Sequence, residues 1–187
     1  MVLSGDTIKK MIIENGLVCD EKTIVNGKKY LDYVLGNVGP DNLDIRIGHV
    51  LLRPKASSTG YIDLHQKPEY EQLTCDSEGS YFLQPGQFCL GTTMERIKLP
   101  NNIKAQIDSR SSIGRRGLIV QTAAHIHAGY EGDITLELKN EAPVAIRIYP
   151  GDIVGQIIFE YLDCATTTPY AGVYQGQTGT TAPEATR

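Results

Sequence analysis

Arginine and serine side chains gather around a glycine in residues 108–118, DSRSSIGRRGL, and these residues are the ones best suited to chemistry in this sequence. One guanidinium group can bind two phosphate oxygens at once, and hydroxyl groups add short hydrogen bonds. Gly114 has no side chain, so the backbone can approach a ligand closely. Further along the chain, Glu137 lies between two leucines of a predicted strand. The first segment alone would also suit a basic turn on the surface. Together the two segments indicate a phosphorylated substrate and acid/base chemistry.

Glu137 has two interpretations that the residues themselves leave open. In residues 133–139 the side chains alternate between the two sides of a strand, so the apolar residues share one face and Glu137 lies on the polar face. That polar face either meets solvent or lines a cleft. In a cleft, partial burial would raise the pKa of Glu137 toward neutrality, so that the carboxylate takes and returns a proton. Periodicity alone favours the solvated face.

Composition limits the classes of protein to which the chain can belong. Its 187 residues suit one domain with a proper core, which we predict to span 1–187. The net charge is −4 and the pI is near 5.6, so the chain lacks the excess of positive charge that is typical of proteins that bind DNA or RNA. No apolar run approaches the roughly 18 residues of a membrane span. The first residues have neither a basic nor an apolar leader region, so we expect a cytoplasmic protein.

Cysteine and histidine spacing argues against a bound zinc ion. The four cysteines lie far apart, with no C-x-x-C pair, and are typical of free thiols in a reducing compartment. His125 and His127 share one face of an extended segment, but no third or fourth ligand stands at a useful spacing. We therefore predict ordinary histidines and no metal ligands in the chain.

The elements that must position these residues are mostly short strands. Residues 6–16 form a predicted helix, capped by Ser4 or Asp6 and ended by Gly16. Residues 17–40 look irregular, with a short strand at 30–35. Short alternating or apolar segments separated by Gly, Pro and Asn then indicate an all-β sandwich or barrel. The predicted strands are 43–47, 81–83, 89–92, 103–107, 118–120, 134–138 and 144–148, with a charged insertion-like loop at 53–80.

Seven segments, in the right order, resemble the dCTP deaminase branch of the dUTPase-like trimeric superfamily. For example, the family pattern "G-R-S-S-L-G-R-L-G-L" is similar to residues 109–118, and "G-x-I-T-L-E-L-x-N" is similar to residues 132–140. Any one of these matches would be weak, whereas seven together cover most of the chain. The remaining matches lie at residues 2–8, 42–48, 83–100, 150–159 and 174–181.

The resemblance implies a fold, a reaction and an assembly. The fold would be mainly β, a distorted barrel or jelly-roll-like dUTPase-type fold with a short N-terminal helix, in a homotrimer with sites between subunits. The reaction would be zinc-independent hydrolysis of dCTP to dUTP and ammonia, feeding dUMP and dTTP synthesis, with Mg²⁺ bound through the triphosphate. dTTP is a candidate inhibitor. The tail at about 166–187 would be flexible and close over the nucleotide.

Roles for individual residues also come from the resemblance. Glu137 would be the general base that activates water for attack at cytosine C4, and it would then pass protons to N3 and to the departing ammonia. Ser111 and Arg115 would hold the water and stabilise the tetrahedral intermediate. The remaining substrate contacts would be the triphosphate ligands Arg110, Ser111, Ser112 and Gln177, the base-reading backbone of Thr122 and Ala123, and Tyr170 beside the nucleotide.

Two departures from the family pattern affect recognition rather than chemistry. His127 stands where the family has an aspartate that orders the deoxyribose 3′-hydroxyl and, in dUTPases, activates water. A histidine accepts a hydrogen bond only when neutral, and its ring is bulkier. Val173 replaces a lysine that contacts phosphate, and a lost charge-assisted hydrogen bond typically costs about 1.5–3 kcal/mol.

Three functions therefore stay open. The first is a deaminase that releases dUTP. The second is a bifunctional deaminase and diphosphatase that gives dUMP, against which His127 counts. The third is a catalytically silent paralogue that acts as a regulator by binding a nucleotide or a protein partner, against which the intact Glu137 counts.

Overall fold

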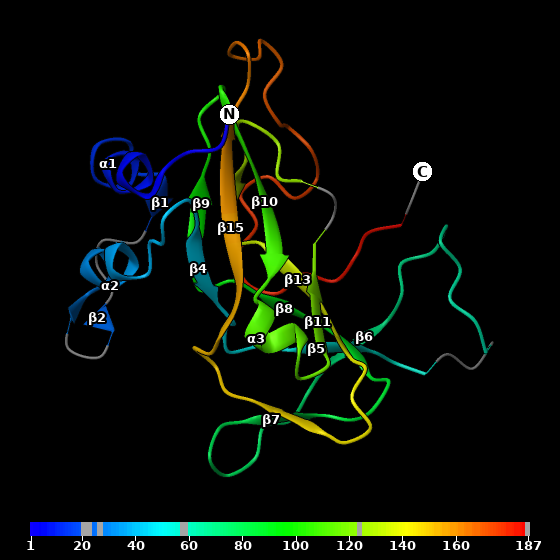
Figure 1. The fold of residues 1–187 in the computed structure, drawn as a ribbon. Coiled ribbons are helices and arrows are strands. Elements are labelled where there is room, and N and C mark those ends of the chain that lie inside the picture. Colours follow the sequence, from blue (N-terminus) through cyan, green and yellow to red (C-terminus); the bar gives the residue numbers. More distant parts are fainter. Residues whose placement is uncertain (20–23, 26–27, 57–59, 123–124, 186–187) are drawn as a thin grey trace.

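Strand β15 (Ile153–Tyr161) runs through the centre of the molecule, between β10 (Ile103–Ser109) and β4 (Leu43–Arg46) (Figure 1). The computed structural model describes residues 1–19, 24–25, 28–56, 60–122 and 125–185. Both neighbours of β15 are antiparallel to it, and Phe159 pairs with Ala105 while Ile157 pairs with Leu43. Because alternate side chains of β10 are buried, one face of this sheet supplies much of the core.

A five-stranded sheet carries Glu137, the predicted general base. It runs in the order β11 (Leu118–Gln121), β13 (Thr135–Asn140), β8 (Phe88–Thr92), β5 (Leu52–Pro54) and β6 (Tyr70–Gln72). In β13 the side chains of Leu136 and Leu138 are fully buried, whereas Glu137 between them is exposed. The alternation expected from the sequence is thus confirmed.

Three small sheets and a short helix complete the strand framework. The chain is mainly β with a short N-terminal helix, as predicted, and the described strands do not close into one barrel. The small sheets are β1 (Val18–Cys19), β9 (Arg96–Lys98) and β12 (Glu131–Gly132); β14 (Ile146–Ile148) and β7 (Tyr81–Leu83); and β2 (Ile24–Val25) and β3 (Lys28–Lys29). The short helix is α3 (Ser111–Gly114).

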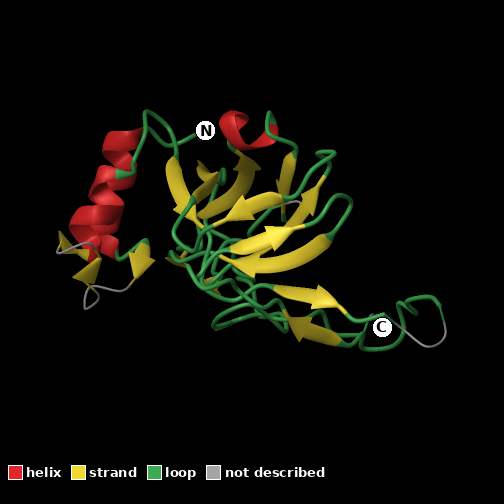
Figure 2. Cartoon of the chain, turned by 90° about the horizontal axis from the view of Figure 1, so that it is seen from below, coloured by secondary structure: helices red, strands yellow, loops and turns green. Residues whose placement is uncertain are grey.

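Helix α1 (Gly5–Asn15) lies within one residue of the predicted helix, 6–16, and its cap is Ser4 and not Asp6. Ser4 is the N-cap, and its Oγ accepts the backbone N–H of Thr7 at 3.4 Å. Gly16 ends the helix with a left-handed φ of 62°. Ile8 and Ile12 bury their side chains against the sheets. Figure 2 shows the two longer helices on one side of the strands, the short helix α3 apart from them, and the β5–β6 hairpin projecting from the other side.

Two local predictions were wrong. Residues 30–35 are not a strand but belong to helix α2 (Tyr30–Gly36), because Tyr30 and Val34, one helical turn apart, both bury their side chains. The region 53–80 is not a plain insertion, since β6 pairs with β5 in a hairpin. Three-residue strands with few apolar side chains give a weak periodic signal, which explains the second error.

A buried ion pair lies between the helices and the central sheet. Arg46 Nε lies 2.7 Å from Glu95 Oε1, and Glu95 Oε2 accepts the Arg46 backbone N–H at 2.9 Å. Both side chains are only 2% exposed. The Tyr33 ring packs on the guanidinium, with its centroid 4.2 Å from Cζ. This pair joins β4 to the turn before β9 and fixes their relative position.

The last residues of the chain fold back along the strands without regular secondary structure (Figure 1, red). Backbone hydrogen bonds tie them down: the Gly176 N–H donates to Glu131 O at 2.8 Å, and the Tyr170 N–H donates to Ala128 O at 2.9 Å. No disulfide joins the cysteines among the described residues. Within the described residues, no helix is long and apolar enough to span a membrane.

Candidate active site

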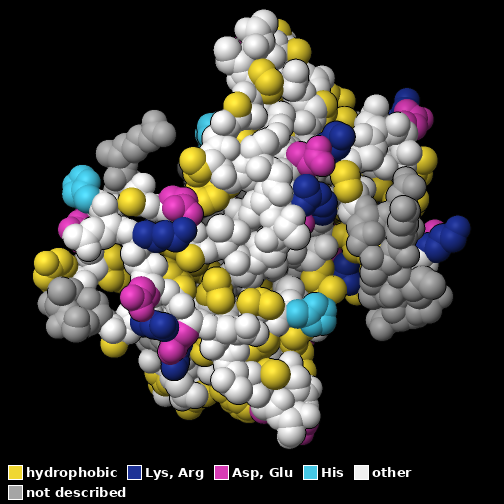
Figure 3. Space-filling model, turned by 180° about the vertical axis from the view of Figure 1, so that it is seen from behind, with side chains coloured by type: hydrophobic (Ala, Val, Ile, Leu, Met, Phe, Trp, Pro, Cys, Tyr) yellow, Lys and Arg dark blue, Asp and Glu magenta, His cyan; other side chains and the backbone are white. Residues whose placement is uncertain are grey.

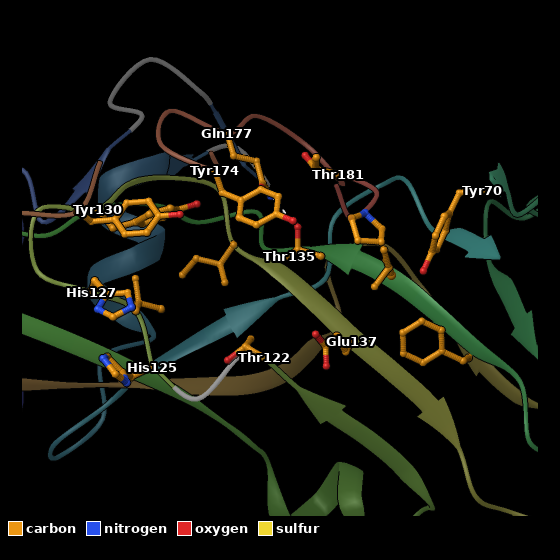
Figure 4. Close-up of a pocket in the computed structure, with 16 residues that line it drawn as sticks. Tyr70, Thr122, His125, His127, Tyr130, Thr135, Glu137, Tyr174, Gln177 and Thr181 are labelled. Carbon is orange, nitrogen blue, oxygen red and sulfur yellow. Dashed lines mark hydrogen bonds between the residues drawn. The ribbon is translucent and has the colours of Figure 1, made fainter. Parts of the chain in front are cut away.

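A cavity of about 400 Å³ opens between the five-stranded sheet and the C-terminal tail. In Figure 4, Tyr174, Gln177 and Thr181 of the tail lie along one side of the cavity, and Glu137 and Thr122 lie along the other. His127 and Tyr130 are at one end and Tyr70 is at the opposite end. Its other lining residues are Phe88, Leu90, His125, Ile126, Ile134, Thr135, Tyr170 and Pro183.

Strand register brings Glu137 next to Thr122. Glu137 pairs with Gln121 of β11 on one side and with Leu90 of β8 on the other. Thr122 directly follows Gln121 in the chain and also lines the cavity. The Glu137 side chain faces the cavity opening and is exposed in the single chain. The solvated and the cleft interpretations are thus both partly right, because Glu137 lies in a cleft that is still open.

Tyr70 is a neighbour of Glu137 that the sequence did not reveal. It comes from β6, in the segment predicted to be a charged, insertion-like loop. Burial, and then the negative charge of Glu137, raise the pKa of the Tyr70 hydroxyl. The hydroxyl therefore stays protonated at neutral pH and offers a donor at this end of the cavity.

The C-terminal tail covers one side of the cavity and makes a side-chain hydrogen bond to β13 there. Gln177 Nε2 donates to Thr135 Oγ1 at 2.6 Å (Figure 4). Thr135 lies two residues before Glu137 on the same face of β13, so strand alternation could have identified it. The Tyr170 and Tyr174 rings are partly buried against the core and narrow the cavity.

His127 is packed among aromatic rings. Its ring stacks on Tyr170 with centroids 5.7 Å apart and planes within 9°, and the His125 ring meets it edge-on at 4.4 Å. Burial lowers the pKa of His125, and the nearby His127 and Lys104 lower it further. At the position of the family aspartate, this chain thus presents an aromatic surface.

The arginine- and serine-rich segment, residues 108–118, lies away from this cavity. Arg110, Ser111, Ser112 and Arg115 line a separate open depression of about 650 Å³ with Arg116 and Gln156. No described residue lines both spaces. Arg110 pairs with Asp44 at 3.5 Å, whereas the described residues offer Arg115 no ion-pair partner. One chain therefore brings together Glu137, Thr122, His127, Tyr170 and Gln177 but not the arginine and serine residues; Ala123 lies outside the described residues.

Charge on the described surface is mixed. Figure 3 shows Lys and Arg groups beside Asp and Glu groups across the face opposite to that of Figure 1. In the described part of the chain, no three His, Cys, Asp or Glu side chains are grouped so that they could hold a metal ion. The donors of segment 108–118, guanidinium and hydroxyl groups, are of the types that bind phosphate oxygens.

Comparison with solved structures establishes the class of fold. The chain is similar to the crystal structure of 2′-deoxycytidine 5′-triphosphate deaminase from Agrobacterium tumefaciens, with a TM-score of 0.63 at 21% identity. The match covers 86% of this chain and 47% of that chain. The molecule therefore has the fold of that deaminase, as the sequence predicted.

Sequence comparison gives the family. Residues 2–162 match the family described as dCTP deaminase-like, and the chain belongs to that family. It is 37% identical over 186 residues to "dCTP deaminase, dUMP-forming" of Persephonella marina, covering 97% of this chain and 96% of that protein. A protein of the same name from Dictyoglomus thermophilum is 38% identical over 190 residues, covering 97% and 93%.

Proposed function

We propose that this protein deaminates dCTP by hydrolysis. One observation carries the proposal: a carboxylate, Glu137, lies in a nucleotide-sized cavity beside a strand end, Thr122, whose backbone can read a base edge. Phe88 and Leu90 of the same cavity provide an apolar surface for the planar ring. Membership of the dCTP deaminase-like family supports the same reaction.

In the proposed reaction a single general base, Glu137, transfers all the protons. Glu137 takes a proton from a water molecule, and the resulting hydroxide attacks C4 of the cytosine ring. Proton transfer to N3 and then to the exocyclic amine breaks the C4–N bond and releases ammonia, so that dCTP and water give dUTP and ammonia. In this proposal Ser111 and Arg115 stabilise the negative charge that develops in the tetrahedral intermediate.

We propose that a neighbouring subunit supplies Ser111 and Arg115. Within one chain these side chains line a space separate from that of Glu137, and Arg115 has no ion-pair partner among the described residues. A homotrimer with sites between subunits would bring the two spaces together, and cyclic symmetry would repeat the contact three times. Oligomerisation would also enclose Glu137, which is exposed in the single chain.

The triphosphate would be held from both sides. Arg110, Ser111 and Ser112 would bind phosphate oxygens from the neighbouring subunit, and Gln177 would bind them from the tail. Tyr170 would pack beside the sugar. Mg²⁺ would enter with the triphosphate as part of the substrate, because the phosphates, and not the arginine and serine residues, provide its oxygen ligands.

The second candidate is formation of dUMP. It is favoured by one observation, the names of the relatives from Persephonella marina and Dictyoglomus thermophilum. Against it stands His127, which puts a ring stacked on Tyr170 at the position of the family aspartate. We therefore propose dUTP as the product, with cleavage to dUMP and pyrophosphate as the alternative that the assay must separate.

Product analysis tests the proposal. The protein is incubated with dCTP or dUTP and Mg²⁺, with and without dTTP as a candidate inhibitor, and nucleotides, pyrophosphate and ammonia are followed over time. We expect dUTP and ammonia from dCTP, and a loss of about 10²–10⁴-fold in Glu137→Gln. Glu141→Gln, which changes an exposed carboxylate paired with Lys139 at 2.6 Å, is the matched control.

The outcomes separate the three functions. Release of dUMP and pyrophosphate would support the bifunctional alternative, and His127→Asp would then be expected to raise the diphosphatase rate. Stabilisation of the fold by dCTP or dTTP, without turnover of either, would support the regulatory alternative. Full activity in Glu137→Gln would contradict the proposed role of the carboxylate.

A further inference from the structure

We propose that Asp133 and Arg96 are positioning residues that hold the tail turn at residues 176–179 over the cavity. The proposal rests on the proposed function, because it assigns this turn the task of presenting Gln177 to the substrate. The two side chains lie outside the cavity and do not touch the expected substrate. They would act through the tail backbone.

Asp133 and Arg96 make three hydrogen bonds to the tail turn. Asp133 Oδ2 accepts the Gly179 N–H at 2.7 Å, and the Asp133 backbone N–H donates to Gln177 O at 3.0 Å. Arg96 Nη1 donates to the same carbonyl at 3.0 Å. The two side chains are also paired with each other, with Arg96 Nη1 3.6 Å from Asp133 Oδ1. The carbonyl of Gln177 is thus held by two donors, one of them charged.

The strand beneath the turn is in close contact with it. A side chain at Gly132 would place its Cβ 3.0 Å from Gln177 O and 3.1 Å from Gln177 N, so the tail backbone lies directly on this glycine. The Gly176 N–H donates to Glu131 O at 2.8 Å, just before the turn. Gly176 and Gly179 both have positive φ, 77° and 69°, which the turn requires.

The turn connects the tail to β13, the strand that carries the proposed general base Glu137. With its backbone fixed, Gln177 extends its amide to Thr135 Oγ1 at 2.6 Å. Thr135 lies two residues from Asp133 and two residues from Glu137. One short segment, 131–137, therefore anchors the tail turn at one end and presents the carboxylate at the other. This arrangement fixes the distance between Gln177, the proposed triphosphate ligand, and Glu137, the proposed general base.

The two side chains are well placed for this task. Arg96 is 28% exposed and Asp133 is 18% exposed, so solvent screens their pairing less than it screens a surface ion pair. Arg96 is held from its other side by Glu131, with Nη2 3.7 Å from Oε1. Their tail contacts are to backbone atoms of a segment without regular secondary structure. Losing these contacts should release the tail and leave the strands folded.

Steady-state kinetics and hydrogen exchange of four variants test the proposal. In Asp133→Ala we expect KM for dCTP to rise about tenfold, since a charge-assisted hydrogen bond is lost, while kcat changes less than about twofold. Asp133→Asn keeps an acceptor for the Gly179 N–H and should restore part of the affinity. Arg96→Gln should raise KM in the same direction. Glu184→Gln is the matched control, because Glu184 ties the tail to Lys67 at 2.6 Å through an exposed pair.

Hydrogen exchange without nucleotide separates this proposal from the proposed function. The Gly176 and Gly179 amides should exchange faster in Asp133→Ala than in the wild type and in Glu184→Gln, with an unchanged melting temperature. If the wild type does not turn over dCTP, the proposed function fails, and the exchange rates still test the turn. Unchanged exchange in Asp133→Ala, or a fall in kcat with no change in KM, would overturn the positioning role.

Discussion

Mixing two inactive variants tests whether one subunit supplies Arg115 to the Glu137 of another. Glu137→Gln removes the proposed base, and Arg115→Ala removes the proposed stabiliser of the intermediate. Within one chain the two residues line separate spaces, which have no lining residue in common among those that the structure describes. If the site lies between subunits, a mixed trimer contains one complete site although each parent contains none.

The expected activity follows from the symmetry of a three-membered ring. A site is complete when a subunit with intact Glu137 is followed by a subunit with intact Arg115. Mixed trimers of either composition have one such junction out of three, so their activity should be about one third of the wild-type activity. An unselected equal mixture, which includes the two inactive homotrimers, should reach about one quarter.

Co-expression with two different affinity tags provides the assay. Successive purification on both tags isolates the mixed trimers, and ammonia release from dCTP is compared with each parent and with the wild type. A mixture of Glu137→Gln with tagged Glu137→Gln is the matched control. Activity no greater than that of the parents would refute the shared site. A monomer in solution would refute it as well.

Two further predictions concern the frame of the molecule. Glu95→Ala leaves the buried Arg46 guanidinium without its carboxylate, 2.7 Å away in the wild type, and should lower the free energy of unfolding by about 3–5 kcal/mol. Urea denaturation measures this change, and a loss below about 1 kcal/mol would contradict the structure. Hydrogen bonds from Ser80, supported by Arg147, lower the pKa of Asp76 to about 2. Since this folded pKa lies below the ordinary value, Asp76 stabilises the fold above about pH 4, and this stabilisation is lost as the pH falls through about 2. The stability difference between the wild type and Asp76→Asn should therefore shrink in that range, and a difference independent of pH would contradict this account.

Local signals in the sequence were sufficient where an element depends on its own residues. Helix α1 has its cap at Ser4 and its end at Gly16, because both signals act within a few residues along the chain. Alternation in residues 133–139 likewise placed Glu137 opposite the buried leucines. Helix α2 was missed because its short stripe, Tyr30 and Val34, is stabilised by burial against the rest of the molecule.

The candidate site was only partly predictable. Motif resemblance named Glu137, Gln177 and Tyr170, and the structure places all three around one cavity. Tyr70 could not be found, since it arrives through a three-residue strand in a region that looks like a loop. The contact of Asp133 with the tail likewise depends on residues far apart in the sequence.

The sequence by itself determined the family, the mainly β character and the face of the strand that carries Glu137, because motifs and periodicity act over a few residues. Only the tertiary structure decided which residues surround that carboxylate. Strand register places Thr122 beside Glu137, and the returning tail places Gln177 across from it. The same structure separated Arg115 from Glu137 within one chain. Long-range pairing and packing set these distances, and no local pattern encodes them.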